Sequence, residues 1–148
     1  MEALFEVRPI DSDSLRSAYA VMQLATPDLT LQDFRRIVGS GRSAGRNAAV
    51  NGIFDRRNYV HAIFRSQIEA LFGVGERLRI YDLLLSDLIS TALLSQMIDA
   101  LEIFARACRC DQMTIEAART ETHTGLPLSD VLVMRGFSGE SLLMARRI

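Results

Sequence analysis

Residues 87–107 form the segment that most limits how this chain can fold. The polar side chains of this segment recur every three or four positions, which is the spacing of one face of an α-helix. They are Thr91, Ser95, Asp99, Glu102 and Arg106. Nearly every other residue is apolar, so we expect a helix that is buried around most of its circumference, as when a helix lies on a β-sheet. Strand-like apolar runs at residues 77–85 and 113–119 flank it and predict a strand, a crossover helix and a parallel strand.

The rest of the chain predicts a sheet that is mixed but mainly antiparallel. Further strands are expected at residues 4–10, 48–55, 59–69 and 140–148, and further helices at residues 15–25, 31–38 and 128–135. Ser12 or Asp13 should cap the first of these helices. Arg56-Arg57-Asn58 predicts a hairpin turn. We therefore expect one α/β (α+β) domain over residues 1–148, with about six strands in one sheet and helices on both faces.

Composition restricts the partners that this chain is expected to have. Its 148 residues are 49% hydrophobic and 24% charged, which is typical of a single globular domain. The net charge of −1 gives no global field that would attract nucleic acid or an anionic membrane. The first 14 residues lack the features of a signal peptide. We expect a cytoplasmic protein that binds neither nucleic acid nor membrane.

Several kinds of chemistry are excluded or disfavoured by residue type. All 17 basic residues are arginine, which excludes Schiff-base and P-loop lysines. Cys108 and Cys110 form a single Cys-x-Cys pair without the paired spacing of zinc sites, so no metal is expected even with His61 and His123 in the chain. The two cysteines are expected to be free thiols. The glycines within residues 39–47 precede a strand rather than a helix, so they predict a plain loop more than a phosphate cradle.

Asp82 is the carboxylate most relevant to catalysis. Strand alternation places it on the same face as Ile80 and Leu84, at or near the edge of the core. A desolvated carboxylate has a raised pKa and can act as a general base. The alternative is that Asp82 bonds to a neighbouring loop or lies on an open sheet edge.

The junction between strand and helix, DLLLSDLISTALL at residues 82–94, has two possible roles. The N-terminus of a helix presents free N–H groups and a positive dipole end, so it can hold a phosphate. Ser86 or Asp87 as N-cap would instead satisfy these N–H groups without any ligand. The carboxylate of Asp87 would also compete with a phosphate, so the sequence favours a capped helix.

The order of elements and three local matches resemble the GNAT superfamily of acyl-CoA-dependent N-acetyltransferases. Residues 79–117 are similar to that family's fourth strand, long helix and fifth strand. ARACRCDQMTI resembles the end of that helix, and VMRGFSGESLLMARR resembles the family's ending of helix, Gly-Phe and strand. The resemblance covers essentially the whole chain and implies a divergent, uncharacterised bacterial member.

This sequence departs from the family at the residues that mark its coenzyme site. The family pattern Arg/Gln–x–x–Gly–x–Gly/Ala, whose backbone amides bind the pyrophosphate of coenzyme A, falls on Leu85, Leu88 and Ser90. The tyrosine that usually serves as general acid corresponds to Leu132. The hydroxyls of Ser90 and Thr91 remain as donors for a weakened anion site.

The resemblance implies an N-acyltransferase that uses acetyl-CoA or another acyl-CoA. Its pantetheine arm would bond to the backbone of Leu83, Leu84 and Leu85, its phosphates would lie near Ser90 and Thr91, and Asp82 would deprotonate the amine. The acceptor would be a small-molecule amine or a protein N-terminus. The alternatives are a catalytically inactive GNAT-like module that binds a ligand or a protein, with a homodimer as its expected assembly, and an unrelated small α/β fold.

Overall fold

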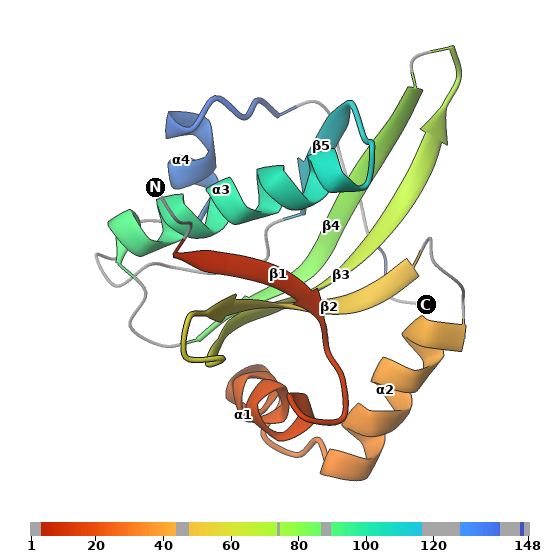
Figure 1. Ribbon diagram of the computed structural model, residues 1–148, viewed down its shortest axis with the longest axis vertical. Coiled ribbons are helices and arrows are strands. Elements are labelled where there is room, and N and C mark those ends of the chain that lie inside the picture. Colours follow the sequence, from red (N-terminus) through yellow and green to blue (C-terminus); the bar gives the residue numbers. More distant parts are fainter. Residues whose placement is uncertain are drawn as a thin grey trace.

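The computed structural model describes residues 4–43, 48–73, 75–86, 90–116, 128–139 and 146. Its elements follow in the order β1, α1, α2, β2, β3, β4, α3, β5, α4 (Figure 1). The strands are β1 (Phe5–Pro9), β2 (Ala48–Asp55), β3 (Val60–Leu71), β4 (Gly75–Leu85) and β5 (Gln112–Ile115). The helices are α1 (Leu15–Ala25), α2 (Leu31–Ser43), α3 (Thr91–Ala107) and α4 (Leu128–Met134). The predicted order of elements is confirmed as far as α4.

The strands form one mixed sheet, as predicted. Their order is β1-β2-β3-β4-β5, with antiparallel pairing from β1 to β4 and parallel pairing between β4 and β5. Helix α3 provides the crossover between the two parallel strands. The described residues contain five strands rather than about six. The strand predicted at residues 140–148 lies outside the described part of the chain, except for Arg146.

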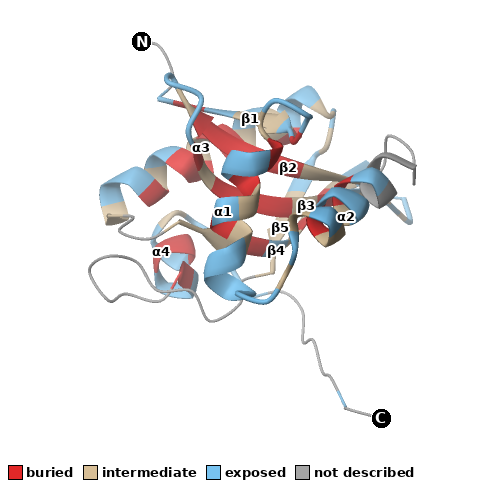
Figure 2. Ribbon diagram, turned by 90° about the horizontal axis from the view of Figure 1, so that it is seen from below, coloured by how far each residue is buried: buried red, intermediate tan, exposed pale blue. Residues whose placement is uncertain are grey.

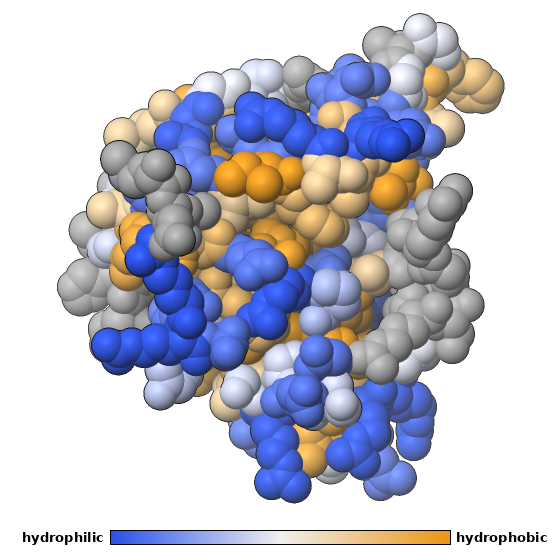
Figure 3. Space-filling model, viewed as in Figure 1, coloured by the Kyte–Doolittle hydropathy of each residue, from blue (hydrophilic) through white to orange (hydrophobic). Residues whose placement is uncertain are grey.

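Helices cover both faces of the sheet and give it two separate cores. Helices α3 and α4 pack on one face, and α1 and α2 pack on the other (Figure 1). Buried residues concentrate on the central strands and on the inward sides of the helices (Figure 2). Hydrophilic side chains predominate over α1 and α2 on the face seen in Figure 3. Alternation along the strands sends successive side chains into the two cores, since Phe64 packs under α3 and Ile63 packs under α1.

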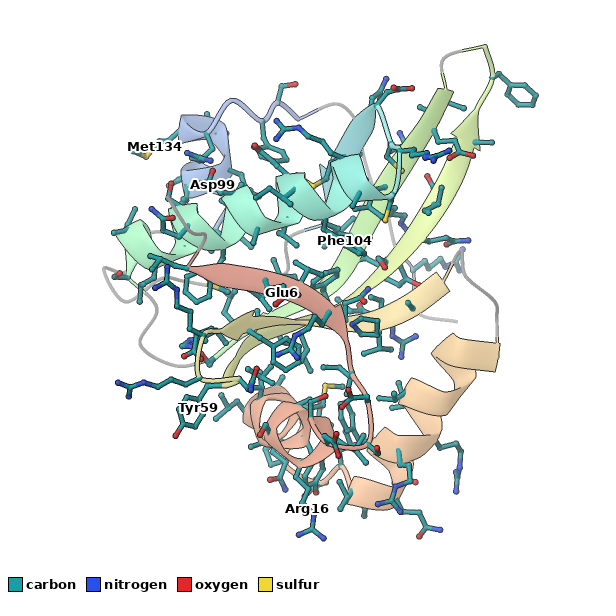
Figure 4. The ribbon with its side chains drawn as sticks, in the orientation of Figure 1. Glu6, Arg16, Tyr59, Asp99, Phe104 and Met134 are labelled. Atoms are coloured by element: carbon teal, nitrogen blue, oxygen red, sulfur yellow. The ribbon has the colours of Figure 1, made fainter. Side chains whose placement is uncertain are left out.

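The middle of the polar stripe predicted for the long helix lies beside α4, whereas Arg106 at its C-terminal end is exposed. Asp99 points from α3 toward α4 (Figure 4), where its carboxylate pairs with Arg135. Leu128, Val131 and Leu132 of α4 are buried in the same core. Helix α4 is therefore held by apolar packing and by an ion pair to the polar side of α3.

One predicted helix end and one predicted helix cap are wrong. The second helix does not end at residue 38 but continues to Ser43, and residues 44–47 of the predicted loop lie outside the described part. An exposed glycine such as Gly39 costs a helix only about 1 kcal/mol, which the added backbone hydrogen bonds outweigh. The first helix is capped at Ser14, not at Ser12 or Asp13. The side chain of Asp11 accepts the N–H groups of Asp13 and Ser14 there.

The hairpin predicted at Arg56-Arg57-Asn58 is confirmed. Asn58 has a backbone φ of 66°, a left-handed conformation that Asn accepts more readily than most residues. The Asp55 carboxylate accepts the N–H groups of Arg57 and Tyr59, at 2.8 and 3.1 Å. Such side-chain bonds to the backbone two residues on are typical of Asp in turns.

No described helix has both the length and the apolar character that a membrane span requires.

Candidate functional site

The candidate site lies where a β-bulge interrupts β4. The register of β3 against β4 shifts between Ile63 and Arg65, so Phe64 is opposed by two residues, Asp82 and Leu83. Asp82 is the extra residue and has a backbone φ of 51°. This left-handed conformation is strained for most L-residues, and Asp is one of the few that adopt it. A bulge of this kind bends a strand and re-aims a side chain.

The bulge changes the position that alternation predicts for Asp82. Ile80 packs under α3 whereas Leu84 packs under α1 and α2, so the two residues do not share a face. The Asp82 side chain is 66% exposed, and its Oδ2 lies 3.5 Å from Nε of Arg65. The expectation of a desolvated carboxylate at the core edge is therefore wrong, because the inserted residue projects out of the regular pleat.

An apolar pocket of about 330 Å³ adjoins this ion pair. It lies between the sheet and the layer of α1 and α2, and its wall includes the buried side chains of Phe34 and Ile63. Among its described lining residues, the polar side chains are those of Thr26, Arg65 and Asp82. The site thus combines an apolar cavity with two opposite charges at its rim. Sequence reasoning missed this pocket and the pairing of Arg65 with Asp82, because both form only when segments far apart in the sequence come together.

Strand β4 continues past the end of its ladder with β5, and the bulge lies in this continuation. That ladder ends at Ile80, whose carbonyl accepts the N–H of Glu116 at 2.8 Å, while β4 runs on to Leu85. On the other edge, the N–H of Ser86 donates to the carbonyl of His61 at 2.8 Å. Because backbone groups of successive strand residues point to opposite edges, the N–H and C=O of Leu85 point away from β3. Of the three predicted coenzyme-binding leucines, Leu83 is buried under α3, and Leu84 and Leu85 are half-buried.

The N-terminus of α3 is capped by Ser90. Its Oγ accepts the N–H of Leu93 at 3.2 Å. The predicted cap at Ser86 or Asp87 is therefore wrong, and Asp87 lies outside the described residues together with Leu88. A hydroxyl that accepts one bond still has its own hydrogen to donate. Thr91 is the first residue of the helix, so both predicted hydroxyl donors lie at the positive end of the helix dipole.

A larger hollow of about 660 Å³ lies between β5 and the residues that follow α4. Its lining is strongly charged, and four of these charges form two close ion pairs. Arg77 bonds to Glu69 at 2.8 Å, and Arg79 bonds to Glu116 at 2.7 Å. These pairs are closer than the 3.5 Å between Arg65 and Asp82, so their charges are less available to a ligand, and we place the site at the apolar pocket.

His61 has a structural setting. Its Nε2 lies 2.8 Å from Oδ2 of Asp55, and its ring meets Phe5 edge-on with centroids 5.2 Å apart. Burial raises the pKa of the Asp55 carboxyl, but hydrogen bonds from His61, Tyr59 and Arg57 outweigh it, and the pKa is lowered overall. His123 lies outside the described residues.

The remaining candidate residues do not contribute to the site. Cys108 and Cys110 are unbridged, and burial raises the pKa of both thiols. Within the described ranges, no three His, Cys, Asp or Glu side chains gather as a metal site. Leu132, which stands where the family has its tyrosine, is buried in the core beneath α4.

The fold is shared with known acetyltransferases. The sequence matches no protein-family model and no curated protein. A GNAT family acetyltransferase from Staphylococcus aureus is similar in structure, with a TM-score of 0.71 and 8% identity over 97% of this chain and 98% of that one. Glucosamine-6-phosphate N-acetyltransferase from Arabidopsis thaliana has a TM-score of 0.61 and 17% identity, with 97% of each chain covered. An aminoglycoside N-acetyltransferase in complex with CoA has a TM-score of 0.63 and 10% identity over 99% of this chain and 97% of that one.

These likenesses define the class: the chain has the GNAT fold. The fold predicted from the resemblance is thereby confirmed. An unrelated small α/β fold, which the sequence left open, is excluded.

Proposed function

We propose that this protein transfers an acyl group from an acyl-CoA, with acetyl-CoA as the simplest donor, to the nitrogen of a small amine. One observation carries the proposal. The bulge of β4 places Asp82 and an apolar pocket directly beside the strand edge that runs on to Leu85. Donor and acceptor would then meet at the bulge.

The residues around this edge suit coenzyme A. The pantetheine arm contains amide groups, so it can pair with the backbone near Leu83–Leu85 as an added strand would. Ser90 and Thr91 lie at the N-terminus of α3, where the helix dipole favours the diphosphate. When bound, the coenzyme supplies the acyl group as an activated thioester. The CoA complex of the aminoglycoside N-acetyltransferase supports this role for the fold.

Asp82 would bind the ammonium group of the acceptor and relay its proton to water. Its exposure and its pairing with Arg65 favour this role over that of a desolvated base. Acyl transfer forms a nitrogen–carbon bond and breaks the carbon–sulfur bond of the thioester. The ammonium loses one proton through Asp82 before the attack, and the nitrogen loses a second proton, which leaves on the coenzyme thiol.

Calorimetric titration with acetyl-CoA and with free coenzyme A tests the donor site. We expect binding at micromolar affinity. Thr91→Glu adds a negative charge to the first turn of α3, which stabilises the helix but repels a diphosphate. It should therefore weaken coenzyme binding, whereas Gln96→Glu, at an exposed position further along the same helix, should not.

The alternative is a catalytically inactive module that binds a ligand or a protein. Two features favour it. Ser90 caps α3 and so already accepts one of the free helix N–H groups. A buried leucine, Leu132, stands at the position of the usual general acid. Absence of heat with millimolar acetyl-CoA would support this alternative and contradict acyl transfer. Sedimentation at micromolar protein concentration would test the predicted homodimer.

A further inference from the structure

We infer that the acceptor is an α-amino acid with an apolar side chain. Its charged ends would bind the Arg65–Asp82 pair, and its side chain would fill the pocket under α1 and α2. The inference rests on the proposed function for the transfer step, while the binding site it describes stands on the geometry of the pocket.

The charges at the rim of the pocket match a zwitterion. Asp82 and Arg65 lie next to each other, with 3.5 Å between Oδ2 and Nε. The ammonium and carboxylate groups of an α-amino acid are separated by a single carbon atom, so one ligand can reach both side chains. The guanidinium fork binds a carboxylate well because it donates two parallel hydrogen bonds.

The same charges disfavour a polycation. The Arg65 and Asp82 side chains are 43% and 66% exposed, so a ligand can separate this solvated ion pair at little cost in free energy. An acceptor with several ammonium groups would find one carboxylate here and would be repelled by the neighbouring guanidinium. The charges of this site therefore do not match those of a polyamine.

The pocket selects for an apolar side chain of modest size. Its volume of about 330 Å³ is at the lower end for small-molecule sites. Phe34, Ile63 and Leu84 contribute apolar surface to its wall. A charged side chain would lose its hydration there without finding a partner. Each buried methylene group should strengthen binding about fourfold.

L-Leucine is the first probe, and binding is measured by calorimetry or saturation-transfer NMR on the full chain, with and without saturating coenzyme A. Two control ligands remove one feature each: 3-methylbutylamine lacks the carboxylate, and glycine lacks the apolar side chain. We expect L-leucine to bind at least about tenfold more tightly than either. Equal binding of the three ligands, or no binding of L-leucine under either condition, would overturn the inference.

Two variants test the groups that would hold the ligand. Arg65→Gln should remove the preference for L-leucine over 3-methylbutylamine, and an unchanged preference would refute the role of Arg65. Ala25→Leu, at the end of α1, adds bulk to the pocket wall and should weaken L-leucine binding several-fold. Ala20→Leu is the matched control, because Ala20 is exposed on the same helix and does not line the pocket.

Release of coenzyme thiol in the presence of acetyl-CoA and L-leucine separates the two proposals. Leucine binding without coenzyme binding would retain the amino-acid site and contradict acyl transfer. Coenzyme binding with thiol release for other amines, but neither binding nor turnover of apolar amino acids, would retain acyl transfer and overturn the inference.

Discussion

Replacement of Asp82 separates the conformation of the bulge from its chemistry. Asp, Asn and Gly accept a backbone φ near the 51° found here, whereas a β-branched residue does not. Asp82→Asn keeps the conformation and loses an exposed ion pair, so the free energy of unfolding should fall by less than about 1 kcal/mol. Asp82→Gly should be near neutral. Asp82→Val should lose a further 1–2 kcal/mol or so, because its side chain clashes in the left-handed region.

Urea unfolding of the four proteins measures these differences. Each kcal/mol corresponds to a shift of roughly 2–4 °C in Tm for a chain of this size, so thermal unfolding gives an independent check. If Asp82→Val is as stable as Asp82→Asn, the strained residue is not at position 82 and the account of the bulge is wrong. Turnover is measured on the same samples. A loss of about 10²-fold or more in the stable Asn variant would support proton relay by Asp82, and full activity would refute it.

Three further changes test the packing of the sheet. Asn51 and Ser66 are buried and bonded at 2.8 Å, so Ser66→Ala should lower the free energy of urea unfolding by about 1–3 kcal/mol. The Asn51→Ala/Ser66→Ala double variant should lose less than the two single losses added, and additivity would contradict this. Gly75 has a φ of 90°, and a Cβ there would meet Oδ2 of Asp111 at 2.0 Å. The Asp111 carboxylate is the end of an exposed side chain and can move away, so Gly75→Ala should lower Tm mainly because of its φ of 90°. Gly73→Ala, with open space and a φ of 70°, should lower Tm less. The Asp55 carboxyl has a pKa lowered from 3.8 in the folded state. The ionised Asp55 should stabilise the fold fully above pH 3.8, the pKa of the unfolded chain, and this stabilisation should be lost as the pH falls through the lower folded pKa. The difference in free energy of unfolding between the wild type and Asp55→Asn should therefore narrow only in acid.

Local patterns in the sequence were strong enough to predict most of the fold. Residues 48–55 and the turn at Arg56-Arg57-Asn58 carry their own signals, because alternation and turn residues act over a few positions. The helix after residue 90 was predictable for the same reason, since its polar stripe has a helical period. Element ends were less certain, because capping depends on which of several nearby polar residues reaches the free N–H groups.

The site was much less predictable than the fold. Asp82 is identifiable from the sequence because a carboxylate interrupts an apolar strand, which is a local signal. The three leucines that follow, Leu83, Leu84 and Leu85, are apolar on either face, so alternation could not reveal an inserted residue. Arg65 meets Asp82 only after β3 and β4 pair, and Phe34 reaches the pocket only after α2 packs on the sheet. Such contacts depend on tertiary structure.

The bulge also has a consequence for chain length. Counting along β4 without Asp82, the residues from Ile80 to Leu85 alternate regularly between the two faces of the sheet, with Ile80, Leu83 and Leu85 in one core and Leu84 in the other. Arg65, Phe64 and Ile63 then lie opposite Tyr81, Leu83 and Leu84 in turn. A one-residue deletion at position 82 would thus leave a regular strand with every leucine on its present face. Packing of the cores does not require the inserted residue, and its left-handed backbone carries strain that a regular strand would avoid. The extra residue therefore adds a carboxylate to the rim of the pocket without adding to the packing of either core.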